Sequence, residues 1–438
     1  NDQNIEDYFV GGRKMGSMHV GLSVVATAVG KGLSIGLGGL GFVIGVSGSW
    51  MLFTGLLGAW LSAVFLIPKI STLARDINLF TFPQVFNHLY NSKVAFIAGI
   101  ISAIGYIGFT SSQILAGAKL ASASFDGLDM KTALIIMGAV AVIYTVMGGL
   151  KAVIYTDTVQ WIILMSGLIF IGIPMAYNAI GGYEVIQSTL PKEFISFTNL
   201  SWQDIVNWAV TIIPIWFVGM TLYQRIYACR TQREAQKAWF IAGLLEWPIM
   251  ALMGVMLGLF ARVAVENGMF TEMGIFTAVA LDPEMGLPLL LKHILPVGLM
   301  GLMLSAYFSA IMSTADSCLM AASGNIVTDI IGVNPHNKNQ LRMSQVITLV
   351  VGVLAILIAS TMENVLSLML YSYAFMVSGL FVPIIGGLFW KRSSSIAAFW
   401  SMLIGGSTTL YLIITDVALP LGLDANIFGI LASLTSFI

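Results

Sequence analysis

Apolar runs of roughly 17 to 25 residues recur along nearly the whole chain, and one such run crosses the ~30 Å hydrocarbon core of a bilayer as a helix. Polar residues or Gly and Pro separate twelve segments, at about 18–46, 48–68, 94–121, 132–148, 155–180, 206–223, 238–264, 295–330, 344–361, 363–390, 395–415 and 420–438. The first and eighth exceed a straight span, which predicts tilt, a break or an extension. We therefore expect an all-α polytopic membrane protein.

Composition excludes several other classes of protein. The 438 residues are 58% hydrophobic and 9% charged, whereas soluble domains carry about 25% charged residues. A net charge of -1 gives no electrostatic footprint for nucleic acid, so the expected surroundings are a lipid bilayer. Cys229 and Cys318 belong to no metal-ligand or disulfide pattern, and the four histidines form no cluster with a nucleophile. We expect no enzyme, no transition metal and no organic cofactor.

Lysines and arginines fall unevenly between the two sides of the predicted membrane protein. Fourteen of the twenty lie before the first segment or in loops after even-numbered segments, and five lie on the other side. Basic residues in short loops accumulate on the cytoplasmic side. The distribution predicts a multi-pass protein of the cell (inner or plasma) membrane with residue 1 in the cytoplasm, and it indicates no oligomeric state.

Segments one to five and six to ten form two halves of five segments each. Because five is an odd number, the second half crosses the membrane in the direction opposite to the first, as expected of an inverted repeat. The first helix of each half is interrupted, around Gly30 and Gly32 in one and between Pro214 and Gly219 in the other. Such breaks mark a midplane binding site in transporters. The alternative is that glycine simply lets membrane helices pack closely, and it remains open for the glycines of 36–41.

Four ionisable side chains lie at predicted membrane depth, where each costs about 2.5–3.5 kcal/mol. They are Lys31, Asp157, Glu246 and Asp316. Lys31 and Glu246 have opposite signs, which favours pairing with one another or with a charged substrate. Three arrangements fit: both line the substrate cavity, they form a structural or gating ion pair, or Glu246 lies near the lipid interface.

Segment eight carries an oxygen-rich face. Ala310, Ser313, Thr314 and Ser317 follow the i, i+3, i+4, i+7 spacing that places residues on one side of a helix. Oxygen ligands hold hard cations, so this face predicts a sodium site, and Asp316, about 60° round the helix, would join a second ion or proton site. The alternative is that the hydroxyls bond to carbonyls of their own helix.

Five motifs in order resemble the sodium:solute symporter family, whose members take up sugars, proline, pantothenate, choline, carboxylates and related solutes. The motifs are EDYFVGGR at 6–13, GGLKAVIYTDTVQ at 148–160, YQRIYACRTQREAQK at 223–237, LPVGLMGLMLSAYFSAIMSTADS at 295–317 and GLFWKR at 387–392. The match covers essentially the full length and is loosely nearest the choline-transporter-like branch. A family helix that precedes EDYF is missing and the last residues are apolar, so we expect both termini to be truncated.

The resemblance implies a single transporter domain over 1–438 with a LeuT-type 5+5 inverted repeat, core helices at about 18–390 and peripheral helices at about 395–438. The sodium ligands implied are Ala26, Val29, Ala310, Ser313 and Thr314. The residues implied for a second cation or proton are Asp157, Asp316 and Ser317. The expected substrate-binding residues are Lys31, Leu33, Trp216 and Glu246, with Trp216 as a stacking wall.

Lys31 departs from the family pattern, because a small or neutral residue is expected there. A cation at this place disfavours a quaternary ammonium substrate and would compete with sodium if it reached the ion site. We therefore expect sodium-coupled symport of a small polar organic solute, carboxylate-bearing or zwitterionic. The alternatives are a proton-coupled or uncoupled transporter of the same fold, and a transporter-like sensor domain of a signalling protein.

Overall fold

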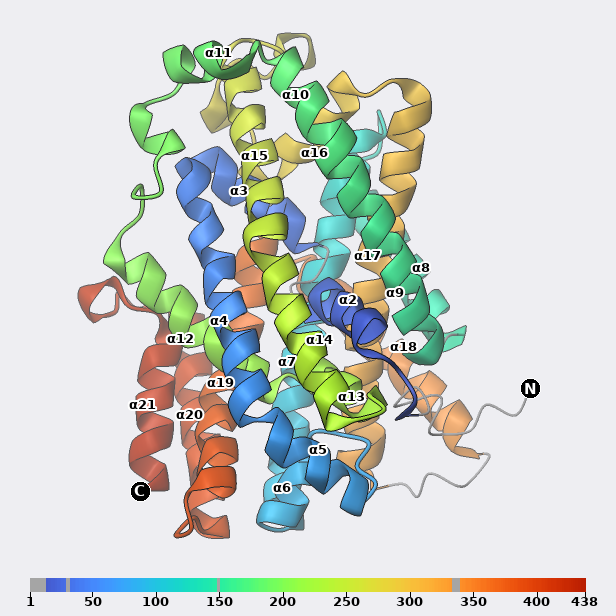
Figure 1. The fold of residues 1–438 in the computed structure, drawn as a ribbon, viewed down its shortest axis with the longest axis vertical. Coiled ribbons are helices and arrows are strands. Elements are labelled where there is room, and N and C mark those ends of the chain that lie inside the picture. Colours follow the sequence, from blue (N-terminus) through green and yellow to red (C-terminus); the bar gives the residue numbers. More distant parts are fainter. Residues whose placement is uncertain (1–12, 29–31, 148–149, 333–338) are drawn as a thin grey trace.

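The computed structural model describes residues 13–28, 32–147, 150–332 and 339–438, which fold as a bundle of α-helices (Figure 1). Each predicted segment contains helical structure. The helices in these segments are α2 (Ser17–Ala28), α3 (Leu33–Ile44), α4 (Trp50–Phe65), α7 (Ser92–Ser124), α8 (Met130–Met147), α9 (Leu150–Gly167), α10 (Ile173–Ala179), α12 (Trp202–Val218), α13 (Met220–Ala228), α14 (Gln232–Leu244), α15 (Ala251–Glu266), α17 (Val297–Gly324), α18 (Asn339–Ala359), α19 (Val365–Phe389), α20 (Ser395–Thr415) and α21 (Ala425–Phe437).

Four shorter helices lie largely outside the predicted segments. They are α5 (Ile67–Asp76), α6 (Pro83–Leu89), α11 (Gly182–Thr189) and α16 (Pro283–Ile294). Figure 1 shows α5 and α6 at one end of the bundle and α11 and α16 at the other. We refer to these as the α5 end and the α16 end.

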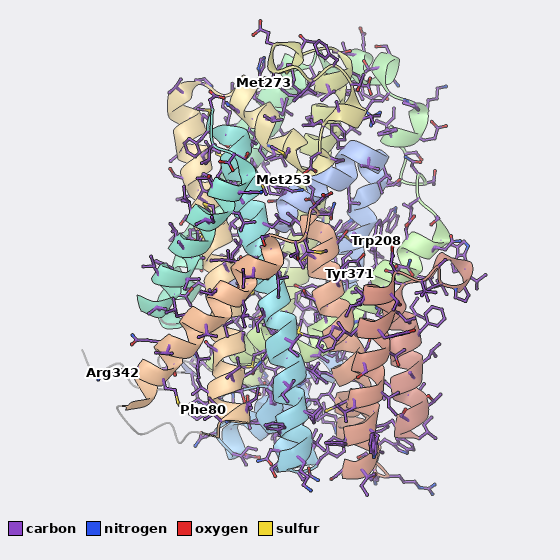
Figure 2. All side chains as sticks on the ribbon, turned by 180° about the vertical axis from the view of Figure 1, so that it is seen from behind. Phe80, Trp208, Met253, Met273, Arg342 and Tyr371 are labelled. Carbon is purple, nitrogen blue, oxygen red and sulfur yellow. The ribbon has the colours of Figure 1, made fainter. Side chains whose placement is uncertain are left out.

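The bundle is long and apolar enough to be embedded in a bilayer. Within the described residues, eight helical stretches could each cross a membrane by length and composition, or nine when the bent pair α12 and α13 is taken as one span. Large apolar side chains cover the outward faces of α8 and α18, as Figure 2 illustrates at the periphery. They include Ile135, Ile136, Val140 and Ile143 of α8 and Val346, Leu349, Val350 and Val353 of α18, all exposed. These surfaces fit lipid rather than water.

Helix α7 runs through the middle of the bundle and packs against α8, α16, α17, α18 and α19. On one side of the molecule α3 packs against α15 and α16, and α14 packs against α2 and α4. The C-terminal helices α20 and α21 pack on each other and on α19. The C-terminal pair α20 and α21 thus lies against α19, at one edge of the bundle (Figure 1).

The predicted interruptions of the first and sixth segments are present. The first segment contains two separate helices, α2 and α3; residues 29–31 lie outside the described part of the chain, and Gly32 directly precedes α3. The sixth consists of α12 and α13, which are bent by 43° at Gly219, whose backbone is extended at φ -69° and ψ 113°. Each half of the chain thus begins with a helix in two parts.

Glycines of α3 allow its backbone to touch the backbone of α15. A Cβ atom at Gly41 would lie 2.0 Å from the Val255 carbonyl oxygen, and one at Gly258 would lie 1.9 Å from the Gly38 carbonyl oxygen. No side chain could fit at either place without moving a helix. Close packing, which the sequence left open as the role of the glycines of 36–41, is the role of Gly38 and Gly41.

We expect Gly41→Ala to destabilise the protein by about 1–3 kcal/mol, the usual cost of forcing an extra methyl group into a packed core. The measurement is thermal unfolding in detergent. Gly301→Ala is the matched control, because Gly301 lies in helix α17 with nothing within 4 Å of its Cβ position, and alanine there should be neutral or slightly stabilising. Equal melting temperatures for the two variants would contradict the direct contact of α3 with α15.

Candidate functional site

Gly32, the residue directly before α3, is anchored to α7 by an amide side chain. The Gly32 backbone N–H donates a hydrogen bond of 3.0 Å to Gln113 Oε1. A Cβ atom at residue 32 would lie 2.7 Å from the same oxygen and 2.8 Å from the Ala116 Cβ. Glycine is therefore required at position 32, because only a residue without a Cβ atom lets the backbone directly before α3 approach α7 so closely.

The break between α12 and α13 is anchored to α7 in a similar way. The Thr221 backbone N–H donates to the Tyr106 hydroxyl at 3.1 Å, and the two hydroxyl groups lie 3.0 Å apart. Tyr106 and Gln113 are seven residues apart and so lie on one face of α7. One face of one helix thus stabilises the interruptions of both halves of the chain.

Three of the five predicted sodium ligands come together between α2 and α17. Thr314 Oγ1 lies 3.2 Å from the Ala26 carbonyl oxygen and 3.4 Å from the Ala310 carbonyl oxygen. Ala26 belongs to the last turn of α2, where carbonyl groups lack partners within the helix. Ser313 is buried on α17 next to Thr314, and Val29 lies outside the described residues. Two carbonyl oxygens and a hydroxyl oxygen are suitable donors for a hard cation.

One of the residues predicted for a second cation, Ser317, lies beside a buried arginine. Asp316 and Ser317 are fully buried on α17, and the side chain of Asp157 lies outside the described part of the chain. Arg225 Nη2 donates to Ser317 Oγ at 3.2 Å and to Thr27 Oγ1 at 2.7 Å, while Arg225 Nε donates to Ser23 Oγ at 3.1 Å. A permanent positive charge therefore links α2, α13 and α17 at this place.

Two of the predicted substrate residues pack against glycines of α4. A Cβ atom at Gly55 would lie 1.9 Å from Glu246 Oε1, and one at Gly58 would lie 2.4 Å from Trp216 Cδ1. Glu246 and Trp216 are each 2% exposed. Gly55 and Gly58 are three residues apart and share one face of α4, so both side chains lie along the same face.

Glu246 occupies the irregular turn between α14 and α15, where Trp247 has non-helical backbone angles. Its Oε2 atom is buried and has no hydrogen-bond partner among the described residues. Lys31, the predicted partner, lies outside them. A buried carboxylate oxygen without a partner is costly, so this atom needs a cation, a donor or a ligand group that the described residues do not supply.

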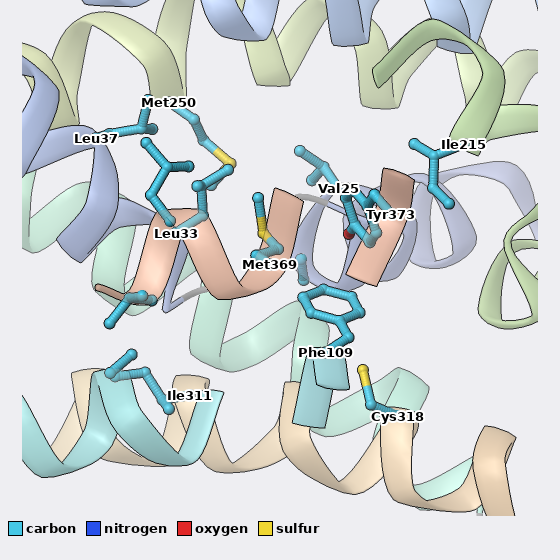
Figure 3. Packing of buried hydrophobic residues seen from close by; sticks show 14 of the residues in the cluster. Val25, Leu33, Leu37, Phe109, Ile215, Met250, Ile311, Cys318, Met369 and Tyr373 are labelled. Atoms are coloured by element: carbon cyan, nitrogen blue, oxygen red, sulfur yellow. The ribbon is translucent and has the colours of Figure 1, made fainter. Parts of the chain in front are cut away.

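Leu33 and Trp216, two of the predicted substrate residues, lie in apolar surroundings. Leu33, the first residue of α3, is buried close to Leu37, Met250 and Met369, as Figure 3 shows. Trp216 stands edge-to-face with Trp239 of α14 at 6.4 Å between ring centres. Its role as a stacking wall stays a prediction.

Three functional residues were not predicted. Tyr106 and Gln113 lie inside the third apolar segment, where a polar side chain such as glutamine is a signal comparable to an ionisable one. Arg225 was counted among loop residues because the predicted sixth segment ended at residue 223. The structure extends α13 to Ala228 and buries Arg225 fully.

Comparison with known proteins identifies the family. The pattern described as "Sodium:solute symporter family" matches residues 8–405. Similar proteins include the high-affinity proline transporter PutP of Bacillus subtilis, 28% identical over 93% of this chain and 86% of the relative. The sodium/pantothenate symporter of Escherichia coli is 26% identical over 99% of this chain and 89% of the relative.

Solved structures agree on the fold. The chain superposes on a substrate-bound, outward-open sodium-coupled sialic acid symporter with a TM-score of 0.78 and 21% identity, covering 99% of this chain and 91% of that one. It is also similar to Mhp1, a nucleobase-cation-symport-1 family transporter in a closed conformation, with a TM-score of 0.60 and 13% identity over 99% and 94% of the two chains. The predicted LeuT-type fold is confirmed. The chain belongs to the Sodium:solute symporter family and is a sodium-coupled transporter of a small organic solute rather than an enzyme.

Proposed function

We propose that this protein binds one sodium ion between α2 and α17 and uses it to drive uptake of a small zwitterionic or carboxylate-bearing solute into the cell. The observation that carries the proposal is the convergence of Thr314 Oγ1 with the carbonyl oxygens of Ala26 and Ala310. Relatives named for proline and for pantothenate, both of which carry a carboxylate, support this class of solute.

The proposed sodium ligands belong to two different helices, and that supports coupling. Without an ion the Thr314 hydroxyl can donate its one hydrogen to a single carbonyl, but with sodium it turns a lone pair toward the ion. An ion at this place is then shared by the last turn of α2 and by α17. Binding of sodium would thus hold α2 against α17, next in sequence to Lys31 and to Leu33 at the start of α3.

We place residue 1 and the α5 end in the cytoplasm of a cell with the protein in its cell membrane. The support is the unequal distribution of basic residues, because loops at the α5 end contain most of the exposed lysines and arginines. The α16 end then faces outward. Solute would enter from the α16 end and leave at the α5 end by alternating access around the midplane breaks.

We assign a single coupling ion because Arg225 already places a positive charge next to Ser317. A guanidinium cannot be deprotonated in a protein and has no acceptor atoms. A second cation close to Ser317 would meet this charge in a medium of low dielectric constant, where like charges repel strongly. Ser317 then accepts a hydrogen bond from the buried arginine, rather than binding the second cation or proton that the family resemblance implied for Asp157, Asp316 and Ser317.

Lys31 and Glu246 are assigned to the solute. A zwitterion offers a carboxylate to Lys31 and an amine to Glu246, and each contact would satisfy a charge that is costly to bury alone. The buried, unpartnered Oε2 of Glu246 supports the second contact. The competing arrangement is a direct Lys31–Glu246 ion pair, and substitution of each residue separates it from solute binding.

Thr314→Val removes the hydroxyl at nearly constant volume. We expect sodium affinity to fall by roughly tenfold to a hundredfold, because loss of a polar partner from a buried group costs about 1–3 kcal/mol. Sodium-dependent uptake into proteoliposomes is the measurement. Thr314→Ser keeps the hydroxyl and should retain sodium dependence. Uptake that ignores both sodium and the valine substitution would refute the ion site and favour the uncoupled or proton-coupled alternative.

The dependence of uptake on sodium concentration should be hyperbolic, with a Hill coefficient of about 1, since that coefficient is bounded by the number of coupled sites. Ser317→Ala should leave this curve unchanged, because the alanine variant removes only one of the acceptors around Arg225. A coefficient near 2 that drops on Ser317→Ala would establish a second cation at Ser317 and overturn the single-ion assignment.

A thermal-shift screen of amino acids and small carboxylates, with and without sodium, should find a ligand that stabilises the folded state. Lys31→Met should then weaken binding of the carboxylate and Glu246→Gln that of the amine, each by about 1–3 kcal/mol. If Lys31 and Glu246 pair only with each other, the double variant will bind better than either single one, a coupling that a double-mutant cycle detects. Additive losses instead support direct contact with the solute.

A further inference from the structure

A buried lysine at the α16 end is paired with two carboxylates that the transport proposal does not use. Lys119, near the end of α7, is 3% exposed. Its Nζ atom lies 2.5 Å from Asp282 Oδ2 and 2.7 Å from Glu284 Oε2. Asp282 caps the N-terminus of α16 and is partly exposed, whereas the Glu284 side chain is only 2% exposed. The cluster carries one net negative charge.

Glu284 also caps the N-terminus of a third helix. Its Oε2 accepts a hydrogen bond of 2.9 Å from the Val365 backbone N–H, and its Oε1 accepts one of 3.0 Å from that of Leu366. These are two of the four N–H groups that a helix start leaves without partners, and the positive end of the α19 dipole favours a carboxylate there. One carboxylate therefore joins α7, α16 and α19.

Helix α3, the second part of the interrupted first segment, rests against the side chain of the same residue, Glu284. A Cβ atom at Gly39 of α3 would lie 2.9 Å from Glu284 Cγ, and one at Gly36 would lie 3.1 Å from Leu366 Cβ. Further along, a Cβ atom at Gly38 would lie 3.0 Å from Leu287 Cβ of α16. The contacts place α3, which begins directly after the proposed ion and solute residues, flat against α16 and the start of α19.

The α5 end is held by contacts of another kind. The Met15 backbone N–H donates to the Ala228 carbonyl at 3.0 Å, the Arg230 backbone N–H donates to the Met15 carbonyl at 3.0 Å, and the Ser17 backbone N–H donates to Glu234 Oε2 at 2.7 Å. These bonds are mainly between backbone groups, and Glu234 is not deeply buried. At the α16 end, by contrast, the described contacts include a buried ion pair, that of Lys119 with Glu284.

We propose that Glu284 is a positioning residue that holds the α16 end closed, so that its charge determines how often this end opens. Separating a buried ion pair in a dry environment leaves uncompensated charges, which is strongly unfavourable. Once water enters, each ion is solvated and the pair contributes little. The cluster is thus stable when dry and paired or when wet and separated, and the states between are disfavoured. Which side of the membrane the α16 end opens toward rests on the proposed transport function.

A thiol-accessibility measurement tests this role directly. Leu287 is fully buried and faces Gly38 of α3, so Leu287→Cys reacts with a membrane-impermeant reagent only when α16 leaves α3. The background carries Ser in place of the natural Cys229 and Cys318. We expect Glu284→Gln to raise the labelling rate by about tenfold or more, since breaking a buried pair costs several kcal/mol.

Transport kinetics provide a second readout. A larger open population raises the apparent affinity for solute on the α16 side in proportion to that population, while the maximal rate falls because the end closes less readily. A residue with only a structural role would lower the melting temperature without this joint fall in KM and in maximal rate.

Glu266→Gln is the matched control. Glu266 forms an ion pair of 3.0 Å with Arg262, four residues earlier on the same helix, and both side chains are partly exposed. The Glu266→Gln substitution removes the same kind of charge at the same end of the molecule. Because the Glu266–Arg262 pair lies within one helix and joins no second helix, labelling should stay unchanged. If Glu284→Gln folds poorly, Asp282→Asn, at the partly exposed member of the cluster, should give a smaller increase in the same direction.

Labelling of the Glu284→Gln variant no greater than that of Glu266→Gln would overturn the proposal. Because labelling needs no solute, it reports on the cluster even if the transport assignment fails. Reagent applied to each face separately also reveals which face the α16 end occupies, so a wrong orientation is distinguished from a wrong role of Glu284.

Discussion

Two interrupted helices leave backbone N–H and carbonyl groups without helical partners in the interior of an apolar protein, and the rest of the structure is arranged around satisfying them. Helix α7 does this with two side chains on one face, Gln113 toward Gly32 and Tyr106 toward Thr221. In the hydrocarbon region each such group would otherwise cost several kcal/mol. The breaks can therefore exist only where α7 passes, and the proposed ion and solute residues lie at or next to them.

Buried charged side chains, like the free backbone groups, are satisfied by partners from other helices. Arg225 donates to hydroxyls of two other helices, and Lys119 is enclosed by two carboxylates, one of which also receives two backbone N–H groups. These charges connect helices that are distant in sequence. Glu246 departs from this rule, with a buried oxygen that the described residues leave without a hydrogen-bond partner. A group left unsatisfied by the fold is the place where a ligand has most to contribute.

The helical segments could be predicted because a bilayer imposes a length and a polarity on each span. The breaks at Gly32 and Gly219 and the approach of Thr314 to Ala26 also followed from spacing and family resemblance. Two things did not. Helix α16 is short and carries charge, so it resembles a loop in composition, and its Glu284 acts through partners 165 and 81 residues away. Likewise, whether glycines at 36–41 serve a ligand or a neighbouring helix depends on which backbone faces them, a tertiary property that no local pattern contains.

The contact between α3 and α15 has a mechanical consequence. Where two helices meet through side chains, small rotamer changes let one slide past the other. Here the carbonyl oxygens of Gly38 and Val255 face the Cα atoms of Gly258 and Gly41 with no side chain in between, so there is nothing to repack. Any displacement of α3 must carry α15 along. The moving part at this end is then a two-helix block, and because α15 continues from the turn that holds Glu246, a motion that begins beside the ion would reach the proposed solute contact without an intermediate link.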